Sequence, residues 1–307
     1  MSESFSRAAR SAREMARMLL RWLVLALPIG LLCGGIGTAF HLAVEAVTEL
    51  RGAHGWLLWL LPAAGLAIVA LYKGTKCEGV GTNNVIRAVQ SGEAVSPLLV
   101  PAIFFGTVLT HLCGGSAGRE GAALQMGGSI GYNIAKLFHF PDHDRRTATV
   151  CGMAAFFSAL FGTPLAATVF AIMVISIGVL YHVALYPSLL AALVAYGVSV
   201  RLGVEPTRFT VAVPDQSVGM FVRVAALGVL CALVSILFCK LMHGAGHLMK
   251  RIKNPWLRVI CGGFAVIALT WVFGTDYNGA GMDIVTAAVE QGIVAVPWAF
   301  LLKLLFT

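Results

Sequence analysis

The chain has 307 residues, of which 58% are hydrophobic and 12% are charged, with a net charge of +8 and a mean hydropathy of +0.85. A soluble domain carries about 25% charged residues, so this composition excludes a soluble globular protein and indicates a membrane protein. The positive charges border apolar segments and do not form a hydrophilic basic face, which excludes a nucleic-acid-binding protein.

The N-terminal segment, residues 1–21, carries five arginines and two glutamates ahead of an apolar run that extends to about residue 44. A signal peptide is the alternative, but the basic part is too long and no A-x-A site ends the apolar run. Arginines three and four residues apart predict an amphipathic helix on the membrane surface, ahead of a retained first span. Because Lys and Arg are enriched on the cytoplasmic side, we expect the N-terminus and residues 240–258 to be cytoplasmic.

Apolar segments follow one another along the whole chain, and several reach the ~20 residues that a helix needs to cross the hydrocarbon core. Others are shorter, and a mixture of full and partial spans is typical of transporters with broken helices. We therefore predict an all-α membrane protein, a bundle of tilted and broken transmembrane helices. The expected spans are 19–44, 56–72, 98–118, 121–140, 147–174, 176–200, 219–242, 256–274 and 292–306.

A weak internal repeat relates residues 77–97 to residues 277–297. The offset of 200 positions is constant over a loop and helix pattern, which is typical of a structural repeat. The basic segments lie at opposite ends of equivalent spans, so the repeat is expected to be inverted, as in many transporters. The identities include Gly79/Gly279, Gly81/Gly281, Gly92/Gly292 and Pro97/Pro297.

This repeat predicts the domain organisation. We expect a cytoplasmic basic helix over 1–21, a first transmembrane repeat over 22–204 and a partial second repeat over 205–307. At the same offset, the counterpart of the glycine-rich segment at 114 would lie at 314, beyond Thr307. We therefore expect further residues or a second chain to complete the second repeat, the alternative being a protein with half a site.

Two charges, Arg119 and Glu120, interrupt the apolar sequence in GGSAGREGAALQMGGSIG, residues 114–131. Charged residues inside a membrane usually face a cavity and serve function. A helix that begins near Gly121 would direct free N–H groups and a positive dipole end at an anion. The loop EGVGTNN, residues 78–84, has the same design. The predicted anion-binding residues are Gly79, Val80, Gly81, Thr82, Asn83, Gly118, Arg119, Gly121 and Ala122.

The Glu120 carboxylate is itself an anion beside one of these helix starts. Ionised, it can occupy the anion site, and protonated it can leave, so one group could couple proton binding to anion passage. Glu120 is therefore the predicted gate and proton acceptor. Arg119 either adds positive potential to the site or pairs structurally.

The segment GREGAALQMGGSIG resembles the G-R-E-G-x-x-x-Q-x-G signature of the CLC family of anion channels and anion/proton antiporters, and the resemblance spans nearly all of residues 20–307. It implies a homodimer with two pores, in which Glu120 is the gating glutamate. It also implies a multi-pass protein of the bacterial inner membrane that moves chloride or fluoride and needs no cofactor. The TNN after Gly81 is similar to the fluoride/proton antiporter branch.

Three departures from the family pattern affect this expectation. Val80 stands where the family has serine, so no hydroxyl is available there. Met173 and Val174 stand where proton-coupled chloride members have an acidic residue, which leaves the proton route and the choice between channel and antiporter open. The family's second anion loop and a late tyrosine would lie beyond Thr307.

Other functions remain as alternatives. One alternative is an intramembrane enzyme that uses Glu120 as general acid or base with His111 as its partner. The sequence shows no candidate nucleophile and no group of metal ligands to support it. A structural, non-conducting membrane subunit is the second alternative. His243 and His247 lie four residues apart without a third ligand, so no metal site is predicted. The preferred prediction is a transporter of a small inorganic anion, with protons as a possible second substrate, and no enzyme.

Overall fold

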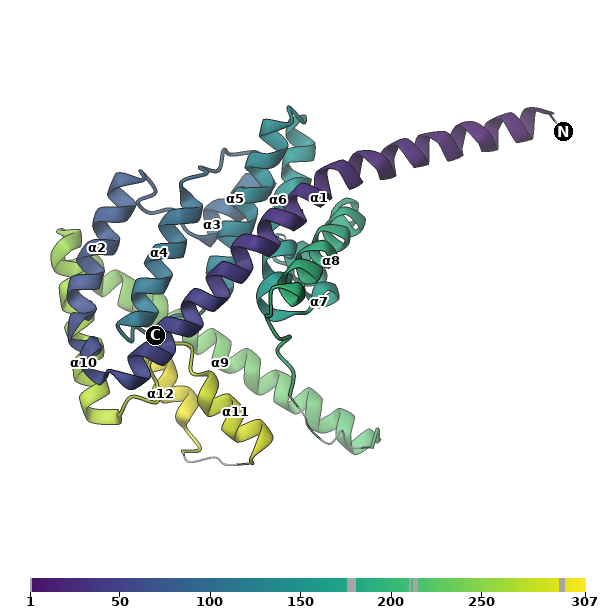
Figure 1. Cartoon of the computed structure of the whole chain (residues 1–307). Helices are drawn as coiled ribbons and strands as arrows, with labels where there is room; N and C mark the ends of the chain where they lie inside the picture. The colour runs from purple at the N-terminus through teal and green to yellow at the C-terminus, as the bar shows by residue number, and fades with distance from the viewer. Residues whose placement is uncertain (1, 176–180, 210, 212–214, 293–295) are drawn as a thin grey trace. The chain divides into compact units, whose positions relative to one another are not determined.

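The computed structural model describes residues 2–175, 181–209, 211, 215–292 and 296–307 (Figure 1). All regular elements among these residues are helices. Five of them are long and apolar enough to cross a membrane, and other apolar helices are shorter. The prediction of an all-α bundle with full and broken transmembrane helices is therefore confirmed.

The helices differ from the expected spans at several of their ends, and two differences concern breaks within a segment. The expected spans 176–200 and 292–306 lie partly outside the described residues. The α1 helix is continuous, so no break separates the basic segment from the first span. The expected span 147–174 is wrong as a single helix, because Gly162 adopts a left-handed φ of 67° after α6 and Pro164 starts α7. The elements are α1 (Ser2–Ala53), η1 (Gly55–Leu60), α2 (Leu61–Gly74), α3 (Thr82–Ser91), α4 (Leu99–Leu112), α5 (Glu120–Leu137), α6 (Asp142–Phe161), α7 (Pro164–Met173), η2 (His182–Ala184), α8 (Leu185–Arg201), α9 (Val218–Lys250), α10 (Pro255–Phe273), α11 (Met282–Glu290) and α12 (Ala299–Phe306).

The chain divides into two compact units. The first comprises residues 1–49, 70–109 and 118–207, and the second comprises residues 50–69, 110–117 and 208–307. Each unit thus combines segments that are distant in the sequence. The repeat boundary expected at 204/205 stays a prediction.

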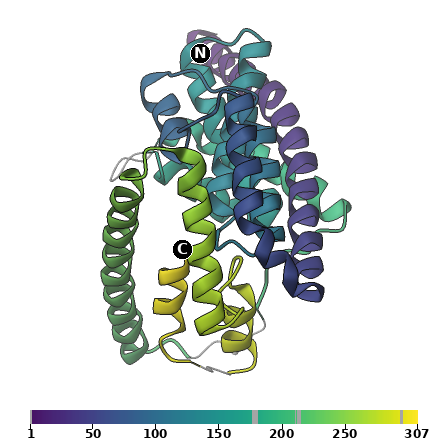
Figure 2. The same ribbon diagram turned by 90° about the vertical axis from the view of Figure 1, so that its left-hand side faces the viewer.

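In the second unit, α2 and α10 pack closely (Figure 2). A Cβ on Gly65 would lie 3.1 Å from Val259, and a Cβ on Gly263 would lie 3.0 Å from the backbone of Pro62. Small residues let helix backbones approach in a membrane, where packing rather than hydrophobic burial drives association.

The element order supports the predicted repeat. The helices α3 and α11 begin at Thr82 and Met282, and α4 and α12 begin at Leu99 and Ala299, so both pairs keep the 200-residue offset. The N-cap glycines of α3 and α11 differ in conformation, because φ is −135° at Gly81 and 75° at Gly281. The other two glycine pairs, one before and one after the helices, correspond, because all four of these glycines have positive φ. The values are 72° for Gly79, 63° for Gly279, 79° for Gly92 and 64° for Gly292.

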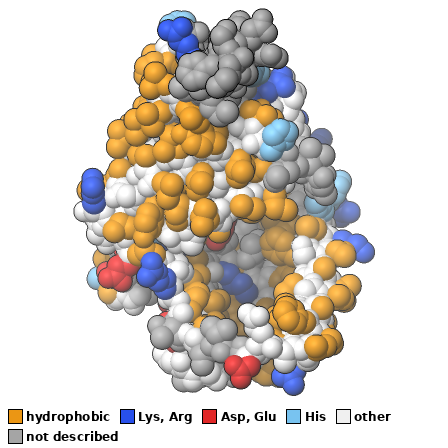
Figure 3. Space-filling model, turned by 90° about the vertical axis from the view of Figure 1, so that its right-hand side faces the viewer, with side chains coloured by type: hydrophobic (Ala, Val, Ile, Leu, Met, Phe, Trp, Pro, Cys, Tyr) orange, Lys and Arg blue, Asp and Glu red, His pale blue; other side chains and the backbone are white. Residues whose placement is uncertain are grey.

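Large apolar side chains remain exposed on many helices, and Figure 3 shows hydrophobic side chains over much of one face of the molecule. None of the α9 residues is buried. In a soluble protein such a surface would cause aggregation, whereas lipid tails or neighbouring protein can cover it in a membrane. The surface therefore agrees with the composition.

The first unit is built around α5 and α6, whose backbones touch. A Cβ on Gly127 or Gly131 would collide with a backbone carbonyl of α6, and a Cβ on Gly152 would collide with the Gly127 carbonyl. The sequence spacing of Gly127 and Gly131 predicts such close packing, and the structure confirms it. Gly30 and Gly34 of α1 have the same role against Val194 and Val198 of α8.

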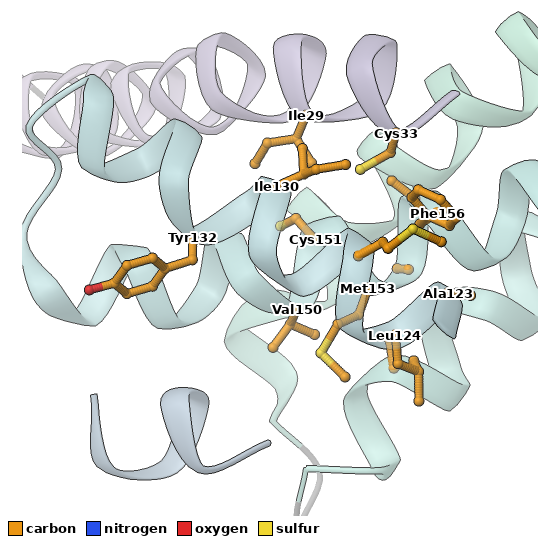
Figure 4. Close-up of a cluster of buried hydrophobic side chains, with 14 of the residues drawn as sticks. Ile29, Cys33, Ala123, Leu124, Ile130, Tyr132, Val150, Cys151, Met153 and Phe156 are labelled. Carbon is orange, nitrogen blue, oxygen red and sulfur yellow. The ribbon is translucent and has the colours of Figure 1, made fainter. Parts of the chain in front are cut away.

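Buried side chains of α1, α5 and α6 interlock beside these glycines (Figure 4). Hydroxyl groups add bonds between helices, because Ser158 Oγ donates to Ala192 O at 2.9 Å and Ser199 Oγ donates to Ala159 O at 2.6 Å. This interior holds the start of α5 on a rigid support. The cluster includes Ile29, Cys33, Ala123, Leu124, Ile130, Val150, Cys151, Met153 and Phe156.

Candidate functional site

The start of α5 carries the charged pair of the glycine-rich segment. The helix begins at Glu120, with Arg119 as its N-cap. The first N–H groups of a helix have no acceptor within it, so this start presents hydrogen-bond donors and a positive dipole end. The Glu120 carboxylate turns back toward this end, because a Cβ added to Gly118 would collide with Glu120 Oε2. Glycine at position 118 therefore leaves the space that the carboxylate occupies.

At the start of α3, some backbone N–H groups already donate hydrogen bonds to acceptors within the same segment. The Val80 N–H donates to a carbonyl within its own loop at 3.2 Å, and the Gly81 N–H donates to Asn84 Oδ1 at 3.0 Å. Asn84 thereby caps the helix through its side chain. The α3 donors open to a ligand are therefore those of Thr82 and Asn83, at the first two positions of the helix.

The starts of α3 and α5 meet at Thr82, within the first unit. Gln125 Nε2 donates to Thr82 Oγ1 at 3.2 Å, and a Cβ on Gly121 would lie 3.4 Å from the same oxygen. The two segments that the sequence predicts to form one site, residues 79–83 and 118–122, therefore converge. Ala122 is buried in the first turn of α5, whereas Gly118, Glu120 and Asn83 are exposed.

The Arg119 guanidinium contacts α1 and α6. Its Nη1 lies 3.4 Å from His41 Nδ1, and its Cζ lies 5.9 Å from the centre of the Phe161 ring, a distance at which a cation attracts an aromatic face. His41 Nε2 in turn lies 3.7 Å from Glu45 Oε2. Arg119 thus has structural partners, and its charge also lies one residue before Glu120.

Sequence reasoning assigned no role to Gln125 or His41. Gln125 belongs to the GREG motif, but nothing in the motif indicates its partner, which lies 43 positions away. His41 stands 78 positions before Arg119 within an apolar span. For Gln125 the sequence offers its place in the motif, and for His41 it offers a polar side chain in an apolar segment.

In the second unit, the glycine loop before α11 binds the side-chain ammonium group of Lys303. Lys303 Nζ donates to Tyr277 O at 2.9 Å, to Gly279 O, and to Ser116 Oγ at 2.8 Å. The position 200 residues earlier is Ile103, which has no charge. The loops before α3 and α11 therefore differ in polarity and also in the backbone conformation of their N-cap glycines. Glu120, the gate candidate, lies beside the first of these loops.

Comparison with known proteins places the chain in a family. The family model for the voltage gated chloride channel matches residues 64–307. The chain is 34% identical to a chloride/fluoride channel protein of Pseudomonas syringae pv. tomato, over 96% of this chain and 67% of that protein. It is 36% identical to the H(+)/Cl(-) exchange transporter ClcA of Cronobacter sakazakii, over 55% of this chain and 40% of that protein.

Solved structures agree with this result. A CLC-type fluoride/proton antiporter superposes with a TM-score of 0.88 at 32% identity, covering 94% of this chain and 74% of that one. A slow cyanobacterial Cl−/H+ antiporter, 21% identical, shares the fold with a TM-score of 0.72 over 92% of this chain and 72% of that one. The resemblance of the GREG segment is thus confirmed over most of the sequence, and the chain belongs to the CLC family of voltage-gated chloride channels.

Proposed function

We propose that this protein transports fluoride across the membrane in exchange for protons, with Glu120 as the gate and proton acceptor. The observation that carries the proposal is the meeting of the α3 and α5 starts at Thr82, beside a single carboxylate. The names of two relatives support the choice of halide, because one is a chloride/fluoride channel protein and the other a fluoride/proton antiporter.

The geometry suits a small anion without its water shell. Helix starts offer N–H groups that can replace water around an anion, and the surrounding low dielectric strengthens each bond. Val80 has no hydroxyl, and its N–H already has an acceptor. The donors for the halide would therefore be the N–H groups of Thr82 and Asn83 on α3, and of Gly121 and Ala122 on α5.

Coupling to protons follows from competition at the α5 start. The ionised Glu120 carboxylate lies over Gly118, close to the donors that a halide would use. Protonation removes its negative charge and with it the attraction to the positive helix end. The sequence has no Asp or Glu between Asp144 and Glu205, so the proposal assigns no proton relay to this segment and rests on Glu120 alone.

The membrane setting and the assembly complete the proposal. Exposed apolar side chains on α7 and α8, such as Leu165, Met173 and Leu193, can contact lipid or a second subunit. We propose a homodimer in the bacterial inner membrane with the basic N-terminal segment in the cytoplasm. Halide, protons and lipid are then the partners of the protein.

Flux from proteoliposomes tests this function. Vesicles containing the purified protein are loaded with fluoride or chloride, and halide release and external pH are recorded with electrodes, with and without an imposed pH gradient. We expect fluoride release to be accompanied by proton uptake and to exceed chloride release. Protein-free vesicles are the control. Chloride release at the faster rate would contradict the choice of halide, and no release of either halide would contradict transport.

Loss of the Thr82 hydroxyl tests the junction between the helices. In Thr82→Val the Gln125 amide loses its acceptor, so we expect fluoride flux to fall roughly fivefold, the effect of one hydrogen bond of ordinary strength. Thr48→Val is the matched control, because the Thr48 hydroxyl donates to the Val44 carbonyl of its own helix at 2.7 Å. Wild-type flux in Thr82→Val would show that the junction does not position the site.

A further inference from the structure

A row of three polar side chains leads from the surface of α1 to the residue before the gate. Glu45 is 57% exposed, His41 is 16% exposed, and Arg119 follows as the N-cap of α5. The contacts are 3.7 Å between Glu45 Oε2 and His41 Nε2, and 3.4 Å between His41 Nδ1 and Arg119 Nη1. All these residues belong to the first unit.

The contact with Arg119 indicates which form of His41 is present. An arginine side chain only donates hydrogen bonds, so His41 Nδ1 must accept and the ring must carry its hydrogen on Nε2. That hydrogen then faces the Glu45 carboxylate. The neutral imidazole thus fits both neighbours, and it holds the guanidinium near Phe161.

Protonation of His41 would reverse this arrangement. The imidazolium has hydrogens on both nitrogens, so Nδ1 can no longer accept from Arg119. Two positive groups at this distance repel, whereas the attraction of the ring to Glu45 increases. Arg119 would then lose its partner on α1, one residue away from Glu120 and the helix start.

The charged groups near His41 come from two elements. Glu45 lies one turn further along α1, and Arg119 lies at the start of α5 with Glu120 beside it. The residue that α6 contributes beside Arg119, Phe161, is uncharged. Histidine is the side chain that ordinarily changes charge between about pH 5 and pH 8, and this sets the pH range over which the row is tested.

We propose that His41 is a positioning residue for Arg119: the neutral imidazole holds the guanidinium away from the anion site, and the protonated imidazole releases it toward the site. The inference rests on the proposed function and adds a second proton-sensitive group to Glu120. Acidity then acts twice, because it neutralises the gate and also increases the positive potential offered to the incoming halide.

The test uses a variant in which Glu120 can no longer bind a proton and measures the pH dependence of halide flux that remains. Passive halide flux is measured for Glu120→Gln in proteoliposomes at equal internal and external pH, between about pH 5 and pH 8. We expect flux to rise roughly fivefold on acidification, the effect of one hydrogen bond of ordinary strength. Adding His41→Asn, which keeps an acceptor but cannot be protonated, should fix the flux at its neutral-pH level. Adding His41→Leu, which has no acceptor, should fix it at its acidic-pH level.

These opposite fixed levels separate positioning from a structural role, which would change both double variants in the same direction. His247→Asn in the same background is the control, because this exposed histidine lies on α9 in the second unit. If Glu120→Gln has no pH dependence, or if His41→Asn leaves the rise intact, the inference is overturned while halide transport stands. Absence of halide flux in the wild type would overturn the proposed function itself.

Discussion

Glu120→Gln is expected to abolish proton movement while halide flux continues. Glutamine has the shape of glutamate but cannot ionise, so it neither binds an exchangeable proton nor competes with the halide as an anion. Proton uptake during halide release should fall to the level of protein-free vesicles, and release should no longer be driven by a pH gradient. The measurement is simultaneous recording of halide and pH in proteoliposomes.

Glu93→Gln is the matched control for this experiment. Glu93 is exposed, and the bond that its carboxylate accepts comes from the nearby Ser91 hydroxyl. It should keep the wild-type ratio of protons to halide. If Glu120→Gln also keeps that ratio, another group carries the proton and Glu120 is not the gate.

Gly152→Val is expected to have the largest effect on stability. The added side chain would meet the carbonyl of Gly127 and the N–H of Gly131, which are backbone atoms of α5 and cannot move aside. Overpacking of a tight interior typically costs about 1–3 kcal/mol, and a clash between two helix backbones belongs at or above the upper end. We expect a lower thermal midpoint in detergent and little monodisperse protein in size-exclusion chromatography.

Gly35→Val distinguishes this clash from the general effect of valine in a helix. Gly35 lies in α1, and a Cβ at this position has no neighbour within 4 Å. Its thermal midpoint should stay close to that of the wild type. Equal losses in both variants would show that the contact between α5 and α6 is not what stabilises the first unit.

Much of the fold follows from local sequence signals. Composition and apolar runs identify a helical membrane protein, and the pairs Gly127/Gly131 and Gly30/Gly34 mark helix contacts that the structure contains. The 200-residue repeat predicts the starts of α11 and α12 from those of α3 and α4. Hydropathy alone did not show the break between α6 and α7, because apolar residues on both sides of Gly162 and Pro164 form one continuous hydrophobic run. The resemblance to the family did imply a turn at this P-L-A sequence.

Less of the site could be predicted in detail. The glycine loops and Glu120 stand out because charges and glycines are unusual inside apolar sequence. The sequence does not show which N–H groups can bind an anion. In the structure the Asn84 side chain accepts a hydrogen bond from the Gly81 N–H, so this group is not available. The roles of the individual anion-binding residues therefore stay predictions that the flux measurements address.

The sequence by itself determined the membrane class, the family and the position of the acidic residue, because composition and motifs are properties of neighbouring residues. It also indicated the repeat, because two such stretches can be compared without knowing where they lie in space. Only the tertiary structure decided that Gln125 meets Thr82 and that His41 meets Arg119. Such contacts depend on how helices rotate and slide as their side chains pack, and no local pattern carries that information.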